Sequence, residues 1–290
     1  MCASFVDRIR IGWSISRDSL TFLARERDLL VLPVLSGIIY LVSALVVFAV
    51  VFLGIVGVGE TPDEGTSELI YIAGVLVYLL LTSISLTFFA AALVYCADRR
   101  FRGHEASIRE GLAVAWKRKS KIVAWGILTA GVGFLIRRLS RRGGAGTAAS
   151  GLLGFSRSVV SFYAVPTIVF SEGSIRETLS ESARLFKGTW GEYASLSLGI
   201  NLLLLPPIAI VILASVFGMP MLADSLVLPA IVLAALLVGV VLLVRQTALG
   251  VAKAALYTYA TTDRLPPQFA DVDLDALASR RAEPPGRGGV

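Results

Sequence analysis

The chain has 290 residues, of which 56% are apolar and only 17% are charged, and its mean hydropathy is +0.77. A soluble domain is about half apolar and about a quarter charged, so this composition excludes an ordinary soluble fold. The net charge of +6 is carried by arginines and lysines that flank apolar runs. That placement favours contact with anionic lipid headgroups over the binding of nucleic acid.

Three segments that begin with serine resemble one another and predict the starts of three surface helices. Ser4, Ser107 and Ser174 are each followed three positions later by an acidic residue, which is the pattern of a capping box. Each segment is followed by an apolar region long enough for two membrane crossings. We therefore expect an all-α polytopic membrane protein with about six transmembrane helices, in three repeats of an amphipathic interfacial helix and a helical hairpin.

The repeats predict a single helical membrane domain over residues 1–265, with units at roughly 4–97, 105–171 and 174–262. Because two crossings return the chain to the side where it began, all three interfacial helices are expected on the same side of the membrane. Residues 266–290 are rich in proline and glycine and are expected to form a cytoplasmic tail that is largely disordered at its end.

The first unit begins with an amphipathic helix over 4–25, which suits the membrane interface or the inner face of the protein itself. Its two spans are predicted at Leu32–Val56 and Leu69–Tyr95, where no charged residue occurs. The loop between them is acidic and lacks lysine and arginine, whereas the loop after the second span is strongly basic. By the positive-inside rule the basic loop is cytoplasmic, and both chain termini then lie on the cytoplasmic side.

The basic loop supplies most of the candidate functional residues. Its cations lie between two apolar spans, where they can bind the phosphate groups of anionic lipids. These candidates are Arg99, Arg100, Arg102, Lys117, Arg118, Lys119 and Lys121. The single histidine, His104, lies in the same loop and cannot form a metal cluster alone, so no metal site is expected.

The second unit is unusual because its first span, Ile122–Ile136, is short for a crossing and is followed by Arg137, Arg138 and two further arginines. If this hairpin crosses the membrane, the arginines lie on the outer side, against the positive-inside rule. A tilted pair of spans with snorkelling arginines would resolve the conflict, and so would a re-entrant hairpin that does not cross. The repeat favours the complete crossing.

The second span of this unit is predicted at 147–170 and contains Arg157 well inside it. An ionisable residue at membrane depth is a candidate for function. An arginine can also pair with backbone carbonyl groups or extend to one interface, and we favour this structural role for Arg157.

The third unit combines an amphipathic helix over 174–190 with spans at Tyr193–Phe217 and Leu226–Val244. The first of these spans contains Asn201 and the double proline Pro206–Pro207. Prolines within a span remove backbone hydrogen-bond donors, and broken helices can line transport sites. A packing kink is the simpler interpretation of the double proline.

Short motifs over most of the chain carry a family resemblance. They are Gly12–Trp13, Asp28–Pro33, Phe162–Pro166, Ser174–Glu192 and Ala255–Ala260. Together they resemble an uncharacterised family of six-span prokaryotic integral membrane proteins, a domain of unknown function. More distantly, the chain is similar to the membrane domain of glycerophosphodiester phosphodiesterases. The resemblance implies the multi-pass fold and a location in the prokaryotic cell membrane, and it implies no known activity.

Enzyme motifs are missing from the sequence, which has no Gly-x-Ser-x-Gly, no HExxH and no phosphate loop. We therefore predict a non-enzymatic integral membrane protein without a cofactor, which binds lipid or a partner in the membrane. The expected partners are anionic membrane lipids, and also a membrane protein or a second copy of the chain, but not nucleic acid. The alternative is a small-solute transporter or channel that uses the region around Arg157, Asn201 and Pro206.

Overall fold

The computed structural model describes residues 2–56, 64–140, 163–218, 224–262 and 264–269, and these residues form helices and no strand. The predicted all-α class is confirmed. Five helices in the described residues are long and apolar enough to cross a membrane, which indicates a membrane protein. They are Arg27–Gly54, Glu68–Phe101, Lys119–Ser140, Gly199–Gly218 and Ser225–Thr262. Most of the span predicted at 147–170 lies outside the described residues, so the six-span arrangement and its three repeats stay predictions.

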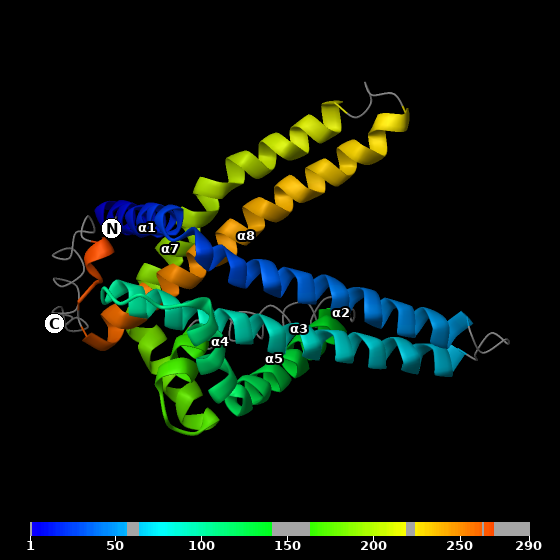
Figure 1. The fold of residues 1–290 in the computed structure, drawn as a ribbon, viewed down its shortest axis with the longest axis horizontal. Helices are drawn as coiled ribbons and strands as arrows, with labels where there is room; N and C mark the ends of the chain where they lie inside the picture. Colours follow the sequence, from blue (N-terminus) through cyan, green and yellow to red (C-terminus); the bar gives the residue numbers. More distant parts are fainter. Residues whose placement is uncertain (1, 57–63, 141–162, 219–223, 263, 270–290) are drawn as a thin grey trace, which may run out of the picture. The chain divides into compact units, whose positions relative to one another are not determined.

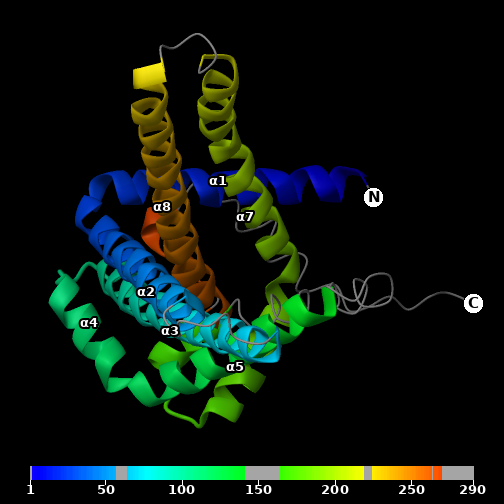
Figure 2. The ribbon, with the colours of Figure 1, turned by 90° about the vertical axis from the view of Figure 1, so that its right-hand side faces the viewer.

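The chain forms two compact units, and the first consists of residues 28–188. Its central helix is α3 (Glu64–Phe101), which forms an antiparallel hairpin with α2 (Val31–Val56), as Figures 1 and 2 show. The short 3-10 helix η1 (Arg27–Leu30) leads into α2. Two further helices, α4 (Ile108–Lys117) and α5 (Lys119–Ser140), also pack on α3.

Glycines allow the neighbouring helices to approach α3 closely. Gly74 on α3 faces α2, and Gly126 on α5 faces α3, and a Cβ atom on either glycine would collide with the opposite helix. A Cβ on Gly111 of α4 would lie 2.5 Å from Cys96 Sγ and 2.8 Å from the backbone oxygen of Ala92. Small residues at such positions increase the van der Waals contact between helices, which is a main stabilising term for helices in membranes.

Two of the three predicted helix starts are capped as expected. Ser107 Oγ accepts a hydrogen bond of 3.2 Å from the backbone N–H of Glu110 at the start of α4. Ser174 and Glu177 make both hydrogen bonds of a capping box before α7. The first predicted cap is wrong, because α1 (Cys2–Arg25) begins before Ser4 and therefore contains it.

The helix α7 (Ile175–Gly218) is continuous over 44 residues and passes from the first unit into the second. The predicted boundary between an interfacial helix ending near 190 and a separate span is therefore wrong. The sequence between them contains glycines but no proline, and a single glycine weakens a helix by only about 1 kcal/mol. The helix also continues through Pro206–Pro207, so the double proline does not divide it.

The second unit consists of residues 1–27 and 189–290. In it α8 (Asp224–Thr262) contacts α1, and α1 contacts the 3-10 helix η3 (Pro267–Phe269). The Phe269 side chain is fully buried, so the first residues of the predicted tail are folded against the unit. The predicted disorder concerns residues 270–290, which lie outside the described residues.

Large apolar side chains are exposed along part of α2, α3, α7 and α8. The exposed stretches are 38–53 of α2, 69–86 of α3, 202–217 of α7 and 226–242 of α8. Farther along, most side chains of α3 between 89 and 101 and of α8 between 247 and 259 are buried. Exposed apolar surfaces of this extent are rare on soluble monomers, and a lipid bilayer would cover them.

Candidate functional site

The predicted lipid-binding cations lie near the end of α3 that contains Arg100, which we call the Arg100 end. Arg100 donates to both carboxylate oxygens of Asp28, from Nη1 to Oδ1 at 3.0 Å and from Nη2 to Oδ2 at 2.5 Å. Its Nη2 also donates to the backbone oxygen of Ala106 at 3.0 Å, and its side chain is only 12% exposed. Because these bonds attach η1 and the loop before α4 to α3, Arg100 has a structural role.

Two other candidates are also held by the protein. Arg102 pairs with Asp98 four residues earlier on the same helix, with an Nε–Oδ2 distance of 3.1 Å, and Asp98 is buried. Lys121 Nζ donates to the backbone oxygen of Ser171 at 2.7 Å, which connects the start of α5 to the segment before α7. These cations are less available to lipid than the sequence predicted.

Arg99 is half-buried, and its Nε has no hydrogen-bond partner among the described residues. The nitrogen is too enclosed for a lipid phosphate to reach it without movement of its neighbours. This nitrogen of Arg99 is therefore not part of an exposed cationic surface.

Lys117, Arg118 and Lys119, which we call the junction cations, lie where α4 meets α5 and form no ion pair with the described carboxylates. Lys119 Nζ lies 5.0 Å from the ring centroid of Trp116, a cation–π distance, and the Trp116 side chain is 62% exposed. Trp116 also meets Phe88 of α3 edge to face, with ring centroids 6.4 Å apart. Tryptophan beside lysine is typical of the membrane–water interface.

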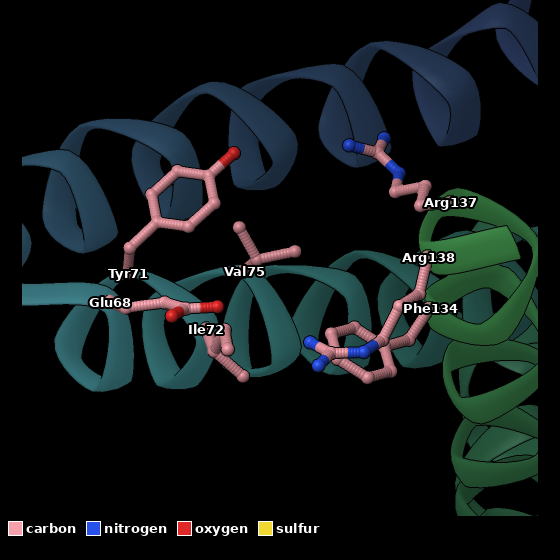
Figure 3. A pocket seen from close by; sticks show the side chains of 7 residues that line it. All are labelled: Glu68, Tyr71, Ile72, Val75, Phe134, Arg137 and Arg138. Carbon is pink, nitrogen blue, oxygen red and sulfur yellow. The ribbon is translucent and has the colours of Figure 1, made fainter. Parts of the chain in front are cut away.

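The opposite end of α3 forms a pocket with the end of α5, which we call the Glu68 pocket (Figure 3). Its volume is about 90 Å³, and its lining consists of Glu68, Tyr71, Ile72, Val75, Phe134, Arg137 and Arg138. Within the described residues, neither arginine forms an ion pair with Glu68. The sequence patterns did not predict this site, although the arginines that contradict the positive-inside rule were a signal for it.

The second unit contains Asn201, whose Oδ1 accepts a hydrogen bond of 2.9 Å from Arg245 Nε of α8. Pro206, which belongs to the region that the transporter alternative would use, lies within the continuous α7. Arg157 lies outside the described residues. Arg245 directly follows the predicted span Leu226–Val244 in the sequence. The structure places it beside Asn201, and this pair connects α7 to α8.

Within the described ranges, no three His, Cys, Asp or Glu side chains gather as metal ligands would. The Cys96 thiol is buried and lies 3.6 Å from the backbone oxygen of Ser107, where it packs between α3 and the start of α4. The absence of cofactor and metal stays a prediction.

A family of unknown function, DUF6159, has a model that matches residues 69–266. The chain belongs to this family. The match includes the junction cations and both arginines of the Glu68 pocket, whereas Asp28 lies before it. No curated protein and no solved structure matches the chain. The predicted membership of an uncharacterised family is thereby confirmed, and nothing links the chain to glycerophosphodiester phosphodiesterases.

Proposed function

We propose that the chain is a non-enzymatic membrane protein that binds anionic lipid headgroups through the junction cations. The observation that carries this proposal is the exposed Trp116 with Lys119 above its ring, next to Lys117 and Arg118. Cations without carboxylate partners on such a surface retain their attraction for phosphate, at about 1 kcal/mol for each lysine or arginine near an anionic membrane.

The contact of Trp116 with Phe88 of α3 supports a position of Trp116 at the headgroup level of the membrane. Twenty positions separate Glu68 from Phe88, which is about 30 Å of helix and equals the usual thickness of the hydrocarbon core. The large apolar side chains of α3 change from exposed to buried close to Phe88. Because Trp116 packs against Phe88, its indole would lie where lipid chains give way to headgroups.

The position of α5 supports a complete membrane crossing by the hairpin predicted over residues 122–170, rather than a re-entrant hairpin. Gly126 packs near Ile84, and Arg138 lines a pocket with Glu68, so α5 runs antiparallel to α3 along the exposed apolar stretch. Lys119 and Arg137 are 18 positions apart, or about 27 Å, which lets α5 carry its cations to opposite headgroup layers.

The orientation follows from charge. The junction cations belong to the strongly basic loop, which we place on the cytoplasmic side together with both termini, in a prokaryotic cell membrane. The Glu68 pocket then lies at the outer headgroup level. Cysteine-accessibility labelling of Ser107→Cys and Ser140→Cys would test this orientation, because the two positions are expected on opposite sides.

A triple substitution tests the lipid-binding proposal. We expect Lys117→Gln, Arg118→Gln and Lys119→Gln together to reduce the anionic lipid that co-purifies with the protein by up to about a hundredfold, from about 1 kcal/mol per charge. Mass spectrometry of the extracted lipid measures the change. The matched control, Lys117→Arg with Lys119→Arg, keeps the charge and is expected to keep the lipid.

Lys121→Gln provides a second control, because Lys121 is already bonded to the Ser171 carbonyl. It is expected to change lipid retention little. Unchanged anionic lipid in the triple variant would refute the proposal.

The alternative function, a small-solute transporter or channel, has no specific observation in its favour among the described residues. Asn201 is bonded to Arg245, and α7 continues through Pro206–Pro207. Solute flux into proteoliposomes, compared with that of Asn201→Ala, would test this alternative.

A further inference from the structure

We propose that the Glu68 pocket binds the headgroup of a zwitterionic phospholipid with a primary amine, with the phosphate on the arginine side of the pocket and the ammonium at Glu68. This site lies at the other end of α5 from the junction cations and selects a different lipid. The inference rests on the transmembrane placement of α3 and α5 in the proposed function, but not on the binding of anionic lipid there.

The arrangement of the pocket places the two kinds of charge on different helices. Figure 3 shows Glu68 and Tyr71 on α3 and Arg137 and Arg138 on α5, with Ile72 and Val75 between them. The two guanidinium groups lie apart, and that of Arg138 lies beside the Phe134 ring. The pocket volume of about 90 Å³ is small, so it suits a compact headgroup rather than a sugar.

The charges in this pocket do not neutralise one another by contact. Glu68 forms no ion pair with Arg137 or Arg138, and the described residues offer these arginines no other carboxylate. A ligand with a negative and a positive group on a short linker can bind both sides together. Guanidinium groups bind phosphate oxygens through paired hydrogen bonds, and an ammonium group donates to a carboxylate.

The apolar surroundings indicate a lipid rather than a free small molecule. Ile72, Val75 and Phe134 contribute much of the lining, and the neighbouring Leu69 and Leu135 are exposed. The pocket therefore adjoins an apolar surface against which the acyl chains of a bound lipid would lie, whereas a free headgroup would not contact it.

Glu68 provides the selectivity. Its carboxylate repels a lipid that has a net negative charge, and it accepts hydrogen bonds from a primary ammonium group. The quaternary ammonium of a choline headgroup cannot donate these bonds and needs more room. Phosphatidylethanolamine is therefore preferred over both phosphatidylglycerol and phosphatidylcholine.

Native mass spectrometry of the full chain, exchanged into nanodiscs with equal amounts of these three lipids, tests the inference. We expect the wild-type protein to retain phosphatidylethanolamine preferentially. Arg137→Gln with Arg138→Gln is expected to reduce this retention about tenfold or more, because charged hydrogen bonds exceed the free energy of a tenfold change. Arg109→Gln, which removes an exposed arginine of α4, is the control and is expected to leave the preference unchanged.

Glu68→Gln gives a sharper readout, because it removes selectivity rather than binding. We expect it to retain lipid but to lose the preference for phosphatidylethanolamine over phosphatidylglycerol. Equal retention of the three lipids by the wild-type protein, or an unchanged preference in Glu68→Gln, would overturn the inference.

Two further comparisons separate the sources of the signal. Displacement of the lipid by soluble glycerophosphoethanolamine at millimolar concentration would show that the headgroup alone suffices, and would overturn the lipid assignment. The triple variant of the junction cations is expected to keep the phosphatidylethanolamine preference. A result against lipid binding at the junction cations can therefore be told apart from a result against lipid binding in the Glu68 pocket.

Discussion

The two ends of α3 contain the same kinds of charged groups in opposite arrangements. At the Arg100 end, Arg100 pairs with Asp28 and Arg102 pairs with Asp98, and Arg100 is largely enclosed. In the Glu68 pocket, a glutamate and two arginines share one cavity without an ion pair between them. Charged side chains near the ends of α3 therefore divide into those that hold the fold together and those that stay available to a ligand. A basic cluster in the sequence is not by itself a binding surface.

The paired end connects parts of the chain that are far apart in sequence. Asp28 and Arg100 are separated by 72 positions, and the Ala106 carbonyl adds the loop before α4. The charges at the Glu68 pocket connect nothing within the described residues. The first group is therefore expected to contribute to stability, and the second to ligand binding.

The largest effect is expected from Arg100→Ala, which leaves Asp28 and the Ala106 carbonyl without their donor. Breaking a fully buried ion pair costs about 3–5 kcal/mol, and we expect about 2–3 kcal/mol here because Asp28 is 52% exposed. Thermal unfolding in detergent measures the loss. The double variant Asp28→Asn with Arg100→Ala is expected to lose less than Arg100→Ala alone, and an equal or greater loss would contradict this explanation.

A smaller effect is expected from Gly111→Ala at the Arg100 end. The new methyl group would meet the backbone oxygen of Ala92, which cannot rotate away, and overpacking of this kind costs about 1–3 kcal/mol. Because alanine favours a helix by about 1 kcal/mol over glycine, we expect a net loss of up to about 2 kcal/mol in the free energy of unfolding.

Gly74→Ala and Gly131→Ala serve as matched comparisons for Gly111→Ala. The first meets only side chains, of which that of Val51 is the nearest, and the second has no atom within 4 Å among the described residues. Both are expected to be milder than Gly111→Ala, with Gly131→Ala neutral or stabilising. If Gly131→Ala were the most harmful of the three, close packing on α3 would not be the cause.

Arg102→Ala is expected to cost less than 1 kcal/mol, even though Arg102 contacts the buried Asp98. The Arg102 side chain is 60% exposed, and exposed ion pairs of this kind contribute about 0.2–1 kcal/mol. The difference from wild type should shrink further in high salt, because salt screens exposed charges. Unfolding curves at low and high salt measure both effects.

The smallest effect on stability is expected from Glu68→Ala. Since Glu68 is exposed and forms no ion pair, its removal is expected to change the free energy of unfolding by less than about 0.5 kcal/mol. A loss as large as that of Arg100→Ala would show that the pocket charges support the fold and would remove the contrast between the two ends.

Local patterns allowed the sequence to predict much of the fold. Uninterrupted apolar stretches identified α2 and α3, and the capping boxes at Ser107 and Ser174 placed the starts of two helices. The same pattern failed at Ser4, because α1 begins before it. The end of the third interfacial helix was mispredicted because no proline or cap near Gly188 stops α7.

The candidate sites were harder to predict because they depend on contacts between distant residues. Arg100 and the junction cations look alike in the sequence, and only the position of Asp28 separates their roles. The Glu68 pocket requires the antiparallel register of α3 and α5, which the composition of neither helix specifies. Asn201 was recognised as polar within a span, but its partner Arg245 lies 44 positions away.

The contrast in length between α3 and α5 has a consequence for where the protein can reside. At about 57 Å, α3 is much longer than the hydrocarbon core and can extend from it without penalty. The much shorter α5 has cations at both ends. In a thicker bilayer, either one of these cations would lie in hydrocarbon or the bilayer would become thinner around the helix. The free energy of the protein in the membrane therefore depends on the difference between the bilayer thickness and the length of α5. The protein is expected to concentrate in membrane regions whose thickness matches that helix.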